Sequence, residues 1–344
     1  MNTIPFPVVP TRKPKAVFLM AQARFDLVYG PCQREAIHAL AEVISPLLLP
    51  ETWARHPGVT CEAEWIFSSW TMPLADEHFL DAFPNLKAVF YAAGTVKPFV
   101  TEALWQRGVT VTSAFAANAI PVAEYTVAQI ILSLKSAWPL ALQIKREKRH
   151  HRSRLIPTPG VYDATVGLIS LGIIGRMVAE RLRDYKCNVI AYDPFISEET
   201  ARKLGVRLCP LEELFETADV VSCHTPLLAE TAGMLRKEHF LRMKRYGTFL
   251  NTSRGAIVDE AGLVEALRAR PDLFAVLDVT WPEPPVPGSP LYELDNVILT
   301  PHIAGSKSHE CFRLAQYMVD EARRLLAGKE LQYVVTPELL GRMA

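Results

Sequence analysis

The sequence predicts an α/β fold in which parallel sheets are covered by helices. With 344 residues the chain is longer than most single domains, so two domains are expected. Short apolar runs alternate with segments of helical period almost throughout, which is typical of parallel strands joined by crossover helices. Hydrophobic residues make up 49% of the chain and charged residues 22%, which is enough apolar material for sizeable cores.

The first predicted unit begins with a strand near the N-terminus. Helices are predicted at 34–44 and 101–108, where apolar side chains recur with helical period. The predicted strands are KAVFLM (15–20), EWIFSS (64–69), LKAVFY (86–91) and VTVTS (109–113).

A long helix from about Asn118 to Arg146 is predicted to follow, before a passage with proline and glycine at 155–164. Its apolar stretch contains Glu124 and Lys135, so we interpret it as a buried helix rather than a membrane span.

The second predicted unit repeats the alternation of strand and helix. Helices are predicted at 174–185 and 259–270. Several polar loops begin where its strands end, and ligands bind at the carboxyl ends of the strands in open α/β sheets. The predicted strands are 165–171, 188–193, 218–224, 247–253, 274–279 and 296–301.

Charge and cysteine usage limit the class of protein. Lys+Arg and Asp+Glu both number 37, so no bulk field attracts nucleic acid or an anionic membrane. The basic run at 145–154 is interpreted as a solvated helix end rather than an interaction site. The six cysteines form no CxxC pair, and prolines interrupt the N-terminus where a signal peptide needs an apolar run. A soluble, cytoplasmic protein with reduced thiols is therefore expected.

A metal site is not expected. The pair His150–His151 has no acid or cysteine nearby at the spacing of metal ligands.

The stretch GLISLGIIG (167–175) resembles the dinucleotide-binding turn G-x-G-x-x-G with Ser170 in the first glycine position. Gly172 allows backbone N–H groups to approach a pyrophosphate, and Gly175 allows the helix to pack closely on the strand. A serine in a glycine conformation costs roughly 1 kcal/mol, which a domain tolerates.

The surroundings of this turn favour a cofactor loop over a plain strand end. It follows a predicted strand, opens a predicted helix, and is followed at the end of the next strand by Asp193. A carboxylate there binds the ribose hydroxyls and repels a 2′-phosphate, so NAD is expected and NADP is less favoured.

Three further loops place Arg254, Glu283 and His302 just past predicted strands. Arginine clamps a carboxylate and polarises a carbonyl, while an imidazolium gives its proton to an alkoxide and a carboxylate holds that imidazole charged and oriented. Taken singly, each residue has a plainer interpretation: Arg254 as an ion-pair partner, Glu283 as a solvated acid, and His302 as the cap of a turn. Together, behind a cofactor loop, they favour reduction of a 2-oxo acid.

The segments VGLISLGIIG, VIAYDPF, CHTPL, NTSRGAIVDE, LDVTWPEP and LTPHIAG, in this order, resemble the D-isomer-specific 2-hydroxyacid dehydrogenase family. AAGTVKPFV (92–100) and the helix at 116–134 extend the resemblance over nearly the whole chain. The family includes glyoxylate/hydroxypyruvate reductases, phosphoglycerate dehydrogenases and D-lactate dehydrogenases.

The resemblance implies two doubly wound, Rossmann-like or flavodoxin-like parallel-sheet domains with the active site in the cleft between them. It implies a substrate domain at 1–117 plus 305–344, an NAD-binding domain at 118–304, and a homodimer to which the long helix contributes.

The resemblance also implies roles for particular residues. Arg254, Glu283 and His302 are then the catalytic set, and Asp278 contacts the nicotinamide end. The substrate is bound by Ala93, Gly94, Thr95 and Arg254. The cofactor is bound by Ser170, Gly172, Ile173, Ile174, Gly175, Asp193, His224, Thr225, Pro226, Thr252, Ser253, Asp278, His302 and Gly305. For His224, a structural role and a cofactor contact are both open.

The expected activity is reversible, NAD(H)-dependent reduction of a small 2-oxo acid such as glyoxylate or hydroxypyruvate to the D-2-hydroxy acid. The substrate loop lacks the more glycine-rich, Asp-Asn-bearing pattern common in phosphoglycerate and lactate enzymes, which weakens any inference of substrate identity. A phosphoglycerate dehydrogenase and an NAD-sensing binding protein similar to the C-terminal-binding corepressors are the alternatives. Formate dehydrogenase is disfavoured because its pattern has glutamine in place of Glu283.

Overall fold

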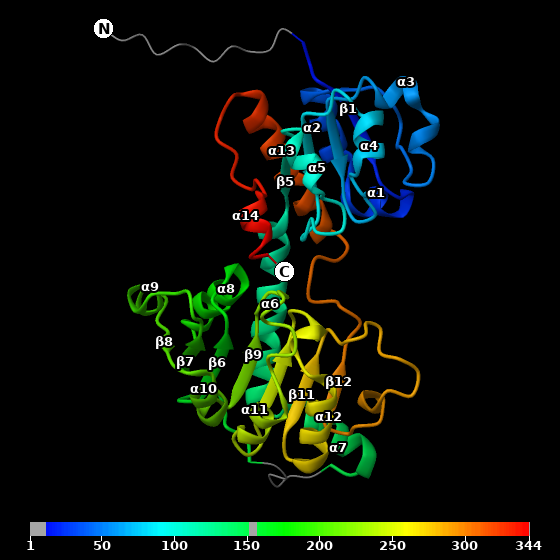
Figure 1. Ribbon diagram of the computed structural model, residues 1–344. Coiled ribbons are helices and arrows are strands. Elements are labelled where there is room, and N and C mark those ends of the chain that lie inside the picture. Colours follow the sequence, from blue (N-terminus) through cyan, green and yellow to red (C-terminus); the bar gives the residue numbers. More distant parts are fainter. Residues whose placement is uncertain (1–11, 151–156, 344) are drawn as a thin grey trace, which may run out of the picture. The chain divides into compact units, whose positions relative to one another are not determined.

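The computed structural model describes residues 12–150 and 157–343, and the chain forms two compact units (Figure 1). Unit 1 contains the chain up to Asn118 together with Ser306–Met343, and unit 2 is Ala119–Gly305. The C-terminal part of the chain therefore returns to the unit in which the chain begins.

Unit 1 is built on a five-stranded parallel sheet with the order β2-β1-β3-β4-β5. This order is the doubly wound one, with helices on both faces. Its strands are β1 (Lys15–Leu19), β2 (Glu42–Val43), β3 (Trp65–Ser68), β4 (Ala88–Tyr91) and β5 (Thr110–Ser113). Its helices are α1 (Gln22–Val28), α2 (Pro31–Leu40), η1 (Trp53–Arg55), α3 (Pro57–Thr60), α4 (Glu77–Ala82), α5 (Glu102–Gln106), α13 (Glu310–Leu326) and α14 (Pro337–Leu340).

Alternate residues of the unit 1 strands face two separate cores. On β1, Val17 and Leu19 pack with α4 and α5, whereas Ala16 and Phe18 pack with α2 and α13. Helix α13 lies among the N-terminal elements of unit 1, as its orange-red ribbon beside the blue and cyan ones shows (Figure 1). Both faces of the sheet are thus buried, as the continuous apolar runs predicted.

Unit 2 is built on a seven-stranded parallel sheet with the order β12-β11-β10-β9-β6-β7-β8. Its strands are β6 (Thr165–Ile169), β7 (Asn188–Tyr192), β8 (Arg207–Leu208), β9 (Val220–Cys223), β10 (Thr248–Asn251), β11 (Phe274–Leu277) and β12 (Val297–Leu299). Its helices are α7 (Ala137–Glu147), α8 (Ile173–Leu182), α9 (Glu198–Lys203), α10 (Leu211–Thr217), α11 (Lys237–Arg242), η2 (Gly255–Ile257), α12 (Glu260–Ala269) and η3 (Pro290–Tyr292). Helix α6 (Phe115–Leu134) begins in unit 1 and continues into unit 2.

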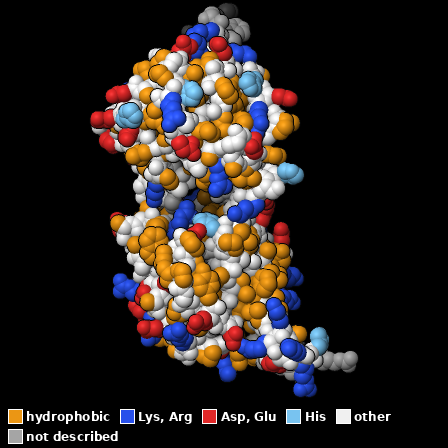
Figure 2. Space-filling view, turned by 90° about the vertical axis from the view of Figure 1, so that its right-hand side faces the viewer, with side chains coloured by type: hydrophobic (Ala, Val, Ile, Leu, Met, Phe, Trp, Pro, Cys, Tyr) orange, Lys and Arg blue, Asp and Glu red, His pale blue; other side chains and the backbone are white. Residues whose placement is uncertain are grey.

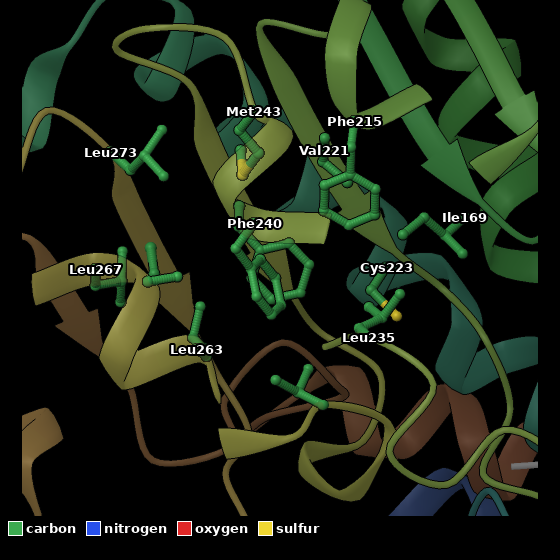
Figure 3. Packing of buried hydrophobic residues seen from close by; sticks show 14 of the residues in the cluster. Ile169, Phe215, Val221, Cys223, Leu235, Phe240, Met243, Leu263, Leu267 and Leu273 are labelled. Atoms are coloured by element: carbon green, nitrogen blue, oxygen red, sulfur yellow. The ribbon is translucent and has the colours of Figure 1, made fainter. Parts of the chain in front are cut away.

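One face of this sheet is covered by α10, α11 and α12, and the other by α6 and α8. Figure 3 shows the first of these cores, with Phe240 in the middle, Phe215 and Val221 on one side, and Leu263 and Leu267 on the other. The Phe240 ring meets the Phe215 ring edge to face, with centroids 5.8 Å apart. The strand order changes direction at β6, between β9 and β7, and ligands bind at such a switch point in open sheets.

The single long helix predicted from Asn118 to Arg146 is wrong, because it is broken at Lys135–Ser136 into α6 and α7. Ser136 has a left-handed conformation with φ 50°, and the Leu134 carbonyl accepts from the Gly160 N–H at 3.0 Å. Pro139 has no N–H for the Lys135 carbonyl, and the break places this proline in the first turn of α7, where no intrahelical donor is required.

Helix α6 is long and apolar enough to cross a membrane, the one such helix among the described residues. In its most apolar window 56% of the residues are buried inside the protein, including Ala123, Val127 and Ile130 in a core of unit 2. The core helix of a soluble protein meets the same length and composition criteria.

On the face that Figure 2 shows, acidic and basic side chains are scattered among one another in both units. Part of the basic run predicted at 145–154, and the N-terminal segment up to residue 11, lie outside the described residues.

Candidate functional site

The turn between β6 and α8 has the conformation of a dinucleotide-binding loop. Ser170, in the first glycine position, has φ 76° in the left-handed region, as expected for a site that favours glycine. Its N–H donates to the Tyr192 carbonyl at 2.8 Å, and its Oγ lies 3.1 Å from Thr225 Oγ1. These two contacts hold the serine in a conformation that costs about 1 kcal/mol.

The two glycines of this turn lie in different surroundings. A Cβ on Gly175 would lie 2.2 Å from the Ser170 carbonyl oxygen, so no larger residue fits between helix and strand. A Cβ on Gly172 would meet nothing within 4 Å, so the backbone there faces open space at the start of α8, next to Ile173 and Ile174. The second glycine leaves a space that a ligand can enter, and the third permits packing.

Asp193 follows β7 and joins the glycine turn to its own loop. Its Oδ2 accepts from the Leu171 N–H at 2.7 Å, and its Oδ1 accepts from the Phe195 N–H at 2.8 Å. Each oxygen retains a further lone pair, which a ribose hydroxyl can occupy.

His224 lies at the end of β9, beside the glycine turn. Its Nε2 lies 3.1 Å from Ser222 Oγ, whereas Nδ1 is buried without a hydrogen-bond partner. Burial lowers the pKa of His224 to about 4, so the ring is neutral near pH 7. Two features fit a bound dinucleotide at the switch point of the sheet. The open space at Gly172 leaves room for a ligand, and the buried Nδ1 of His224 lacks a hydrogen-bond partner that a ligand could supply.

The remaining predicted cofactor residues line the neighbouring strand ends. Thr225 and Pro226 follow His224, and Ser253 Oγ donates to the Thr225 carbonyl. Thr252 Oγ1 lies 3.0 Å from Thr126 Oγ1 on α6, and Gly305 is the last residue of unit 2.

Arg254 follows β10 and is largely withdrawn from water. Its Nη1 donates to the Ser253 carbonyl at 2.7 Å, and this is the one hydrogen bond of its guanidinium within the described residues. Burial lowers the pKa of Arg254, and the nearby Glu283 carboxylate opposes that effect. A partly buried guanidinium with free donors has the properties needed to bind a planar carboxylate.

His302 and Glu283 form the contact that their chemistry predicted. His302 Nδ1 lies 2.6 Å from Glu283 Oε1, a short charge-assisted distance. The two side chains are 47% and 38% exposed, so both remain accessible to a small ligand.

Asp278, at the end of β11, holds the loop that carries His302. Its Oδ1 accepts from Thr300 Oγ1 at 2.5 Å and from the Ile303 N–H at 2.8 Å, and its Oδ2 accepts from the Ala304 N–H at 2.9 Å. His302 has φ 51°, a left-handed conformation that few non-glycine residues adopt without support. Asp278 thus supplies the support that keeps His302 in place.

The predicted substrate loop lies in unit 1, after β4. Ser113 Oγ donates to the Ala93 carbonyl at 2.9 Å and also contacts the Gly94 carbonyl. Thr95 Oγ1 accepts from the Lys97 N–H at 3.4 Å. Arg254, Glu283, His302 and the predicted cofactor residues all belong to unit 2.

Sequence reasoning missed two residues that shape these loops. Thr300 bridges Asp278 and the hydroxyl of Tyr125, which lies 3.2 Å from Thr300 Oγ1. Glu260 accepts from the Trp281 N–H at 3.0 Å, two residues before Glu283. Thr300 and Glu260 both lie next to the segments that carry the predicted site residues, but nothing in the sequence indicates which groups they bind.

A doubly wound parallel sheet with a glycine turn at its switch point and an acid after the next strand defines a dinucleotide-binding α/β protein. Within the described residues, no three His, Cys, Asp or Glu side chains gather as metal ligands.

Comparison with known proteins identifies the family. Residues 128–304 match the family profile described as D-isomer specific 2-hydroxyacid dehydrogenase, NAD binding domain. The chain belongs to this family, and its cofactor is NAD.

Individual relatives agree with this assignment. The chain is 35% identical to the D-3-phosphoglycerate dehydrogenase of Archaeoglobus fulgidus over 260 residues, which are 76% of this chain and 49% of the relative. It thus spans about half the length of the curated relatives it matches.

Two solved structures share the fold. The TT0316 protein of Thermus thermophilus matches with a TM-score of 0.74 and 30% identity, over 94% of this chain and 100% of that one. The D-lactate dehydrogenase of Lactobacillus jensenii, solved with NAD+, matches with a TM-score of 0.75 and 22% identity, over 94% and 99%.

Proposed function

We propose that this protein is an NAD(H)-dependent reductase that interconverts a small 2-oxo acid and the D-2-hydroxy acid. The observation that carries the proposal is the 2.6 Å contact between His302 Nδ1 and Glu283 Oε1, in the same unit as the partly buried Arg254 and the glycine turn. These three side chains provide a proton donor, its orienting carboxylate and a carboxylate-binding cation.

His302 is the proposed acid of the reducing direction. When Glu283 accepts a hydrogen bond from Nδ1–H, the imidazole is held in one orientation and Nε2 carries the second proton of the charged ring. That proton is transferred to the alkoxide that forms from the carbonyl oxygen. NADH, when bound, supplies the hydride to the carbonyl carbon.

Arg254 is the proposed substrate-binding cation. One donor of its fork is used by the Ser253 carbonyl, and the others remain for the oxo-acid carboxylate and the carbonyl oxygen. Because the guanidinium is mostly buried, its attraction to an anion is screened less than it would be at the surface. This placement favours 2-oxo acids over simple ketones.

Glyoxylate and hydroxypyruvate are the substrates we propose first, and 3-phosphohydroxypyruvate is the specific alternative. The alternative is favoured by the name of the curated relatives, D-3-phosphoglycerate dehydrogenase. Against it, the loop AAGTVKPFV at 92–100 lacks the Asp-Asn-bearing pattern common in phosphoglycerate enzymes.

The test is a comparison of kcat/KM for NADH oxidation with glyoxylate, hydroxypyruvate, pyruvate, phenylpyruvate and 3-phosphohydroxypyruvate. We expect the first two to be the best substrates. Preference for the phosphorylated acid would establish the alternative, and no turnover with any of them would contradict the proposed activity.

Repeating the assay with NADPH tests the role of Asp193. Its carboxylate lies beside the glycine turn, 2.7 Å from the Leu171 N–H, where it repels a 2′-phosphate. We expect NADH to be strongly preferred. Equal values for the two coenzymes would show that Asp193 does not select between them.

We also propose that the chain forms a homodimer. None of the residues of α7 is fully buried, although Leu140 and Ile144 are apolar and Trp138 packs against the core of unit 2. Leu132 on α6 and Leu142 on α7 are each 36% exposed. An apolar helix face of this kind is suited to contact with a second copy. Light scattering after size-exclusion chromatography should give twice the chain mass, and Leu142→Glu should shift it toward the monomer.

A further inference from the structure

The loop that carries Glu283 has few contacts of its own to fix it. No residue from Trp281 to Gly288 is buried, and the side chains of Trp281 and Val286 are 62% and 52% exposed. An exposed loop without a buried side chain must be held by hydrogen bonds and by packing at its ends. The position of Glu283, and with it the contact to His302, depends on those anchors.

One anchor is close backbone packing at the start of the loop. A Cβ on Gly255 would lie 2.0 Å from the Thr280 carbonyl carbon, so the segment after Arg254 lies directly against the segment before Glu283. In addition, Thr280 Oγ1 donates to the Pro282 carbonyl at 2.9 Å. These contacts fix Thr280, but the residues after it need further contacts to hold them in place.

Two side chains from outside the loop also hold it: the Tyr292 hydroxyl donates to the Pro285 carbonyl at 3.3 Å, and Glu260 binds the backbone just before Glu283. Glu260 is the first residue of α12, and its Oε2 accepts from the Trp281 N–H at 3.0 Å. The usual task of an acid at a helix start is already done by Asp259, whose side chain accepts from the Gly262 N–H at 3.2 Å. The Glu260 carboxylate is therefore available to the loop.

We propose that Glu260 is a positioning residue of the active site, which fixes the Trp281 backbone and thereby places Glu283 against His302. This inference rests on the proposed function, in which Glu283 and His302 act as a pair. The partial burial that raises the pKa of Glu260 agrees with a carboxylate turned toward the protein, and the Trp281 N–H offsets part of that effect. Its contribution is to hold the proton donor in register, not to contact the substrate.

The experiment compares three substitutions at Glu260 with a control on the same helix. Glu260→Ala and Glu260→Met remove the acceptor, the second at nearly constant side-chain length, whereas Glu260→Gln keeps an oxygen that accepts from the Trp281 N–H. Glu265→Ala is the control, because among the described residues Glu265 binds only the exposed Lys237, at 2.7 Å, on the surface of α12. The readouts are kcat and KM for the best oxo acid, the thermal midpoint, and amide hydrogen exchange at Trp281.

In the Ala and Met variants we expect the Trp281 amide to exchange about tenfold faster or more. We expect kcat to fall about 10- to 100-fold with KM changed by less than about twofold, because misplacement of a proton donor acts on the chemical step. The Gln variant and the Glu265→Ala control should stay close to the parent in both readouts.

Two results would overturn the inference: slow exchange of the Trp281 amide in both variants, or faster exchange with an unchanged kcat. If the Ala variant does not fold, the Met variant decides. If the parent reduces none of the oxo acids, the proposed function fails, while amide exchange still shows whether Glu260 fixes this loop.

Discussion

Glu64 in unit 1 and Asp278 in unit 2 are both buried carboxylates next to a parallel strand. Glu64 lies at the amino end of its strand, and Asp278 lies at the carboxyl end of its strand. Glu64 precedes β3 and accepts from Arg12 at 2.7 Å, Lys87 at 2.6 Å and the Lys15 N–H at 3.1 Å. Asp278 follows β11 and accepts from neutral donors of one loop, Thr300 Oγ1 and the N–H groups of Ile303 and Ala304.

The difference shows what each carboxylate stabilises. Glu64 pairs with cations that lie far away in sequence, so it joins elements of unit 1 at the edge where ligands do not bind in open sheets. Asp278 organises the backbone around His302 at the carboxyl edge, where they do bind. Substitutions among Glu64 and its partners should change stability, and substitutions among the residues of the site near Asp278 should change activity.

The largest expected effect is that of His302→Ala. It removes the proposed proton donor, and we expect kcat to fall by about 10² to 10⁴, the usual contribution of a positioned general acid. NADH binding, measured by fluorescence, should be nearly unchanged. Glu283→Gln should retain more activity than His302→Ala, because a neutral amide still accepts a hydrogen bond from the ring and orients it. A kcat within about twofold of the parent would remove His302 from the mechanism.

Arg254→Lys keeps the charge but loses the two-pronged geometry. We expect kcat/KM for the oxo acid to fall about 10- to 100-fold, mainly through KM, because one or two hydrogen bonds to a charged group are lost. The KM for NADH is the internal control and should stay the same. Normal kinetics would show that Arg254 is only a structural partner of the Ser253 carbonyl.

Gly175→Ala and Gly172→Ala are a matched pair within one turn. The first places a Cβ 2.2 Å from the Ser170 carbonyl oxygen and should lower stability by about 1–3 kcal/mol. The second places a Cβ in open space, so it should leave the thermal midpoint unchanged and weaken NADH binding. Equal losses of stability in the two variants would contradict the division of roles between these glycines.

Glu64 should make unit 1 sensitive to acid. Burial alone would raise the pKa of Glu64, but hydrogen bonds from Arg12, Lys87 and the Lys15 N–H outweigh it and lower the pKa from 4.5 to about 2. A carboxyl whose pKa is lower in the folded state stabilises the protein above its unfolded pKa, and this contribution is lost as the pH falls toward about 2.

Because Arg12 and Lys87 are mostly exposed, we expect the contribution to be only about 1–2 kcal/mol. Urea unfolding between pH 7 and pH 3 should show a steeper loss of stability in the parent than in Glu64→Gln. Parallel curves for the two proteins would show that Glu64 adds nothing.

Ser170→Gly should have the smallest effect. Glycine relieves a left-handed backbone at φ 76°, a gain of about 1 kcal/mol, but the contact of Ser170 Oγ with Thr225 Oγ1 is lost at a similar cost. We expect the thermal midpoint and the KM for NADH to change little. A large stabilisation would mean that the Thr225 contact contributes less than the backbone strain costs.

Local patterns in the sequence predicted much of the fold. The apolar runs identified ten of the twelve strands, because a strand buried on both faces is a continuous run of apolar residues. The two-residue strands β2 and β8 were missed, since so short a run has no periodicity to detect. The helix break before Pro139 was also missed, although the proline is a local signal for it.

By itself, the sequence determined which residues are candidates for the site, because the glycine turn, Asp193, Arg254, Glu283 and His302 all follow strands and are recognisable by residue type. Only the tertiary structure decided which carboxylate accepts hydrogen bonds from which backbone N–H groups. Asp278 accepts from the His302 loop, and Glu260 accepts from Trp281. The reason is physical. A strand end and a glycine turn are local properties of the chain, whereas a hydrogen bond between residues about twenty positions apart depends on how the sheet brings neighbouring loops together.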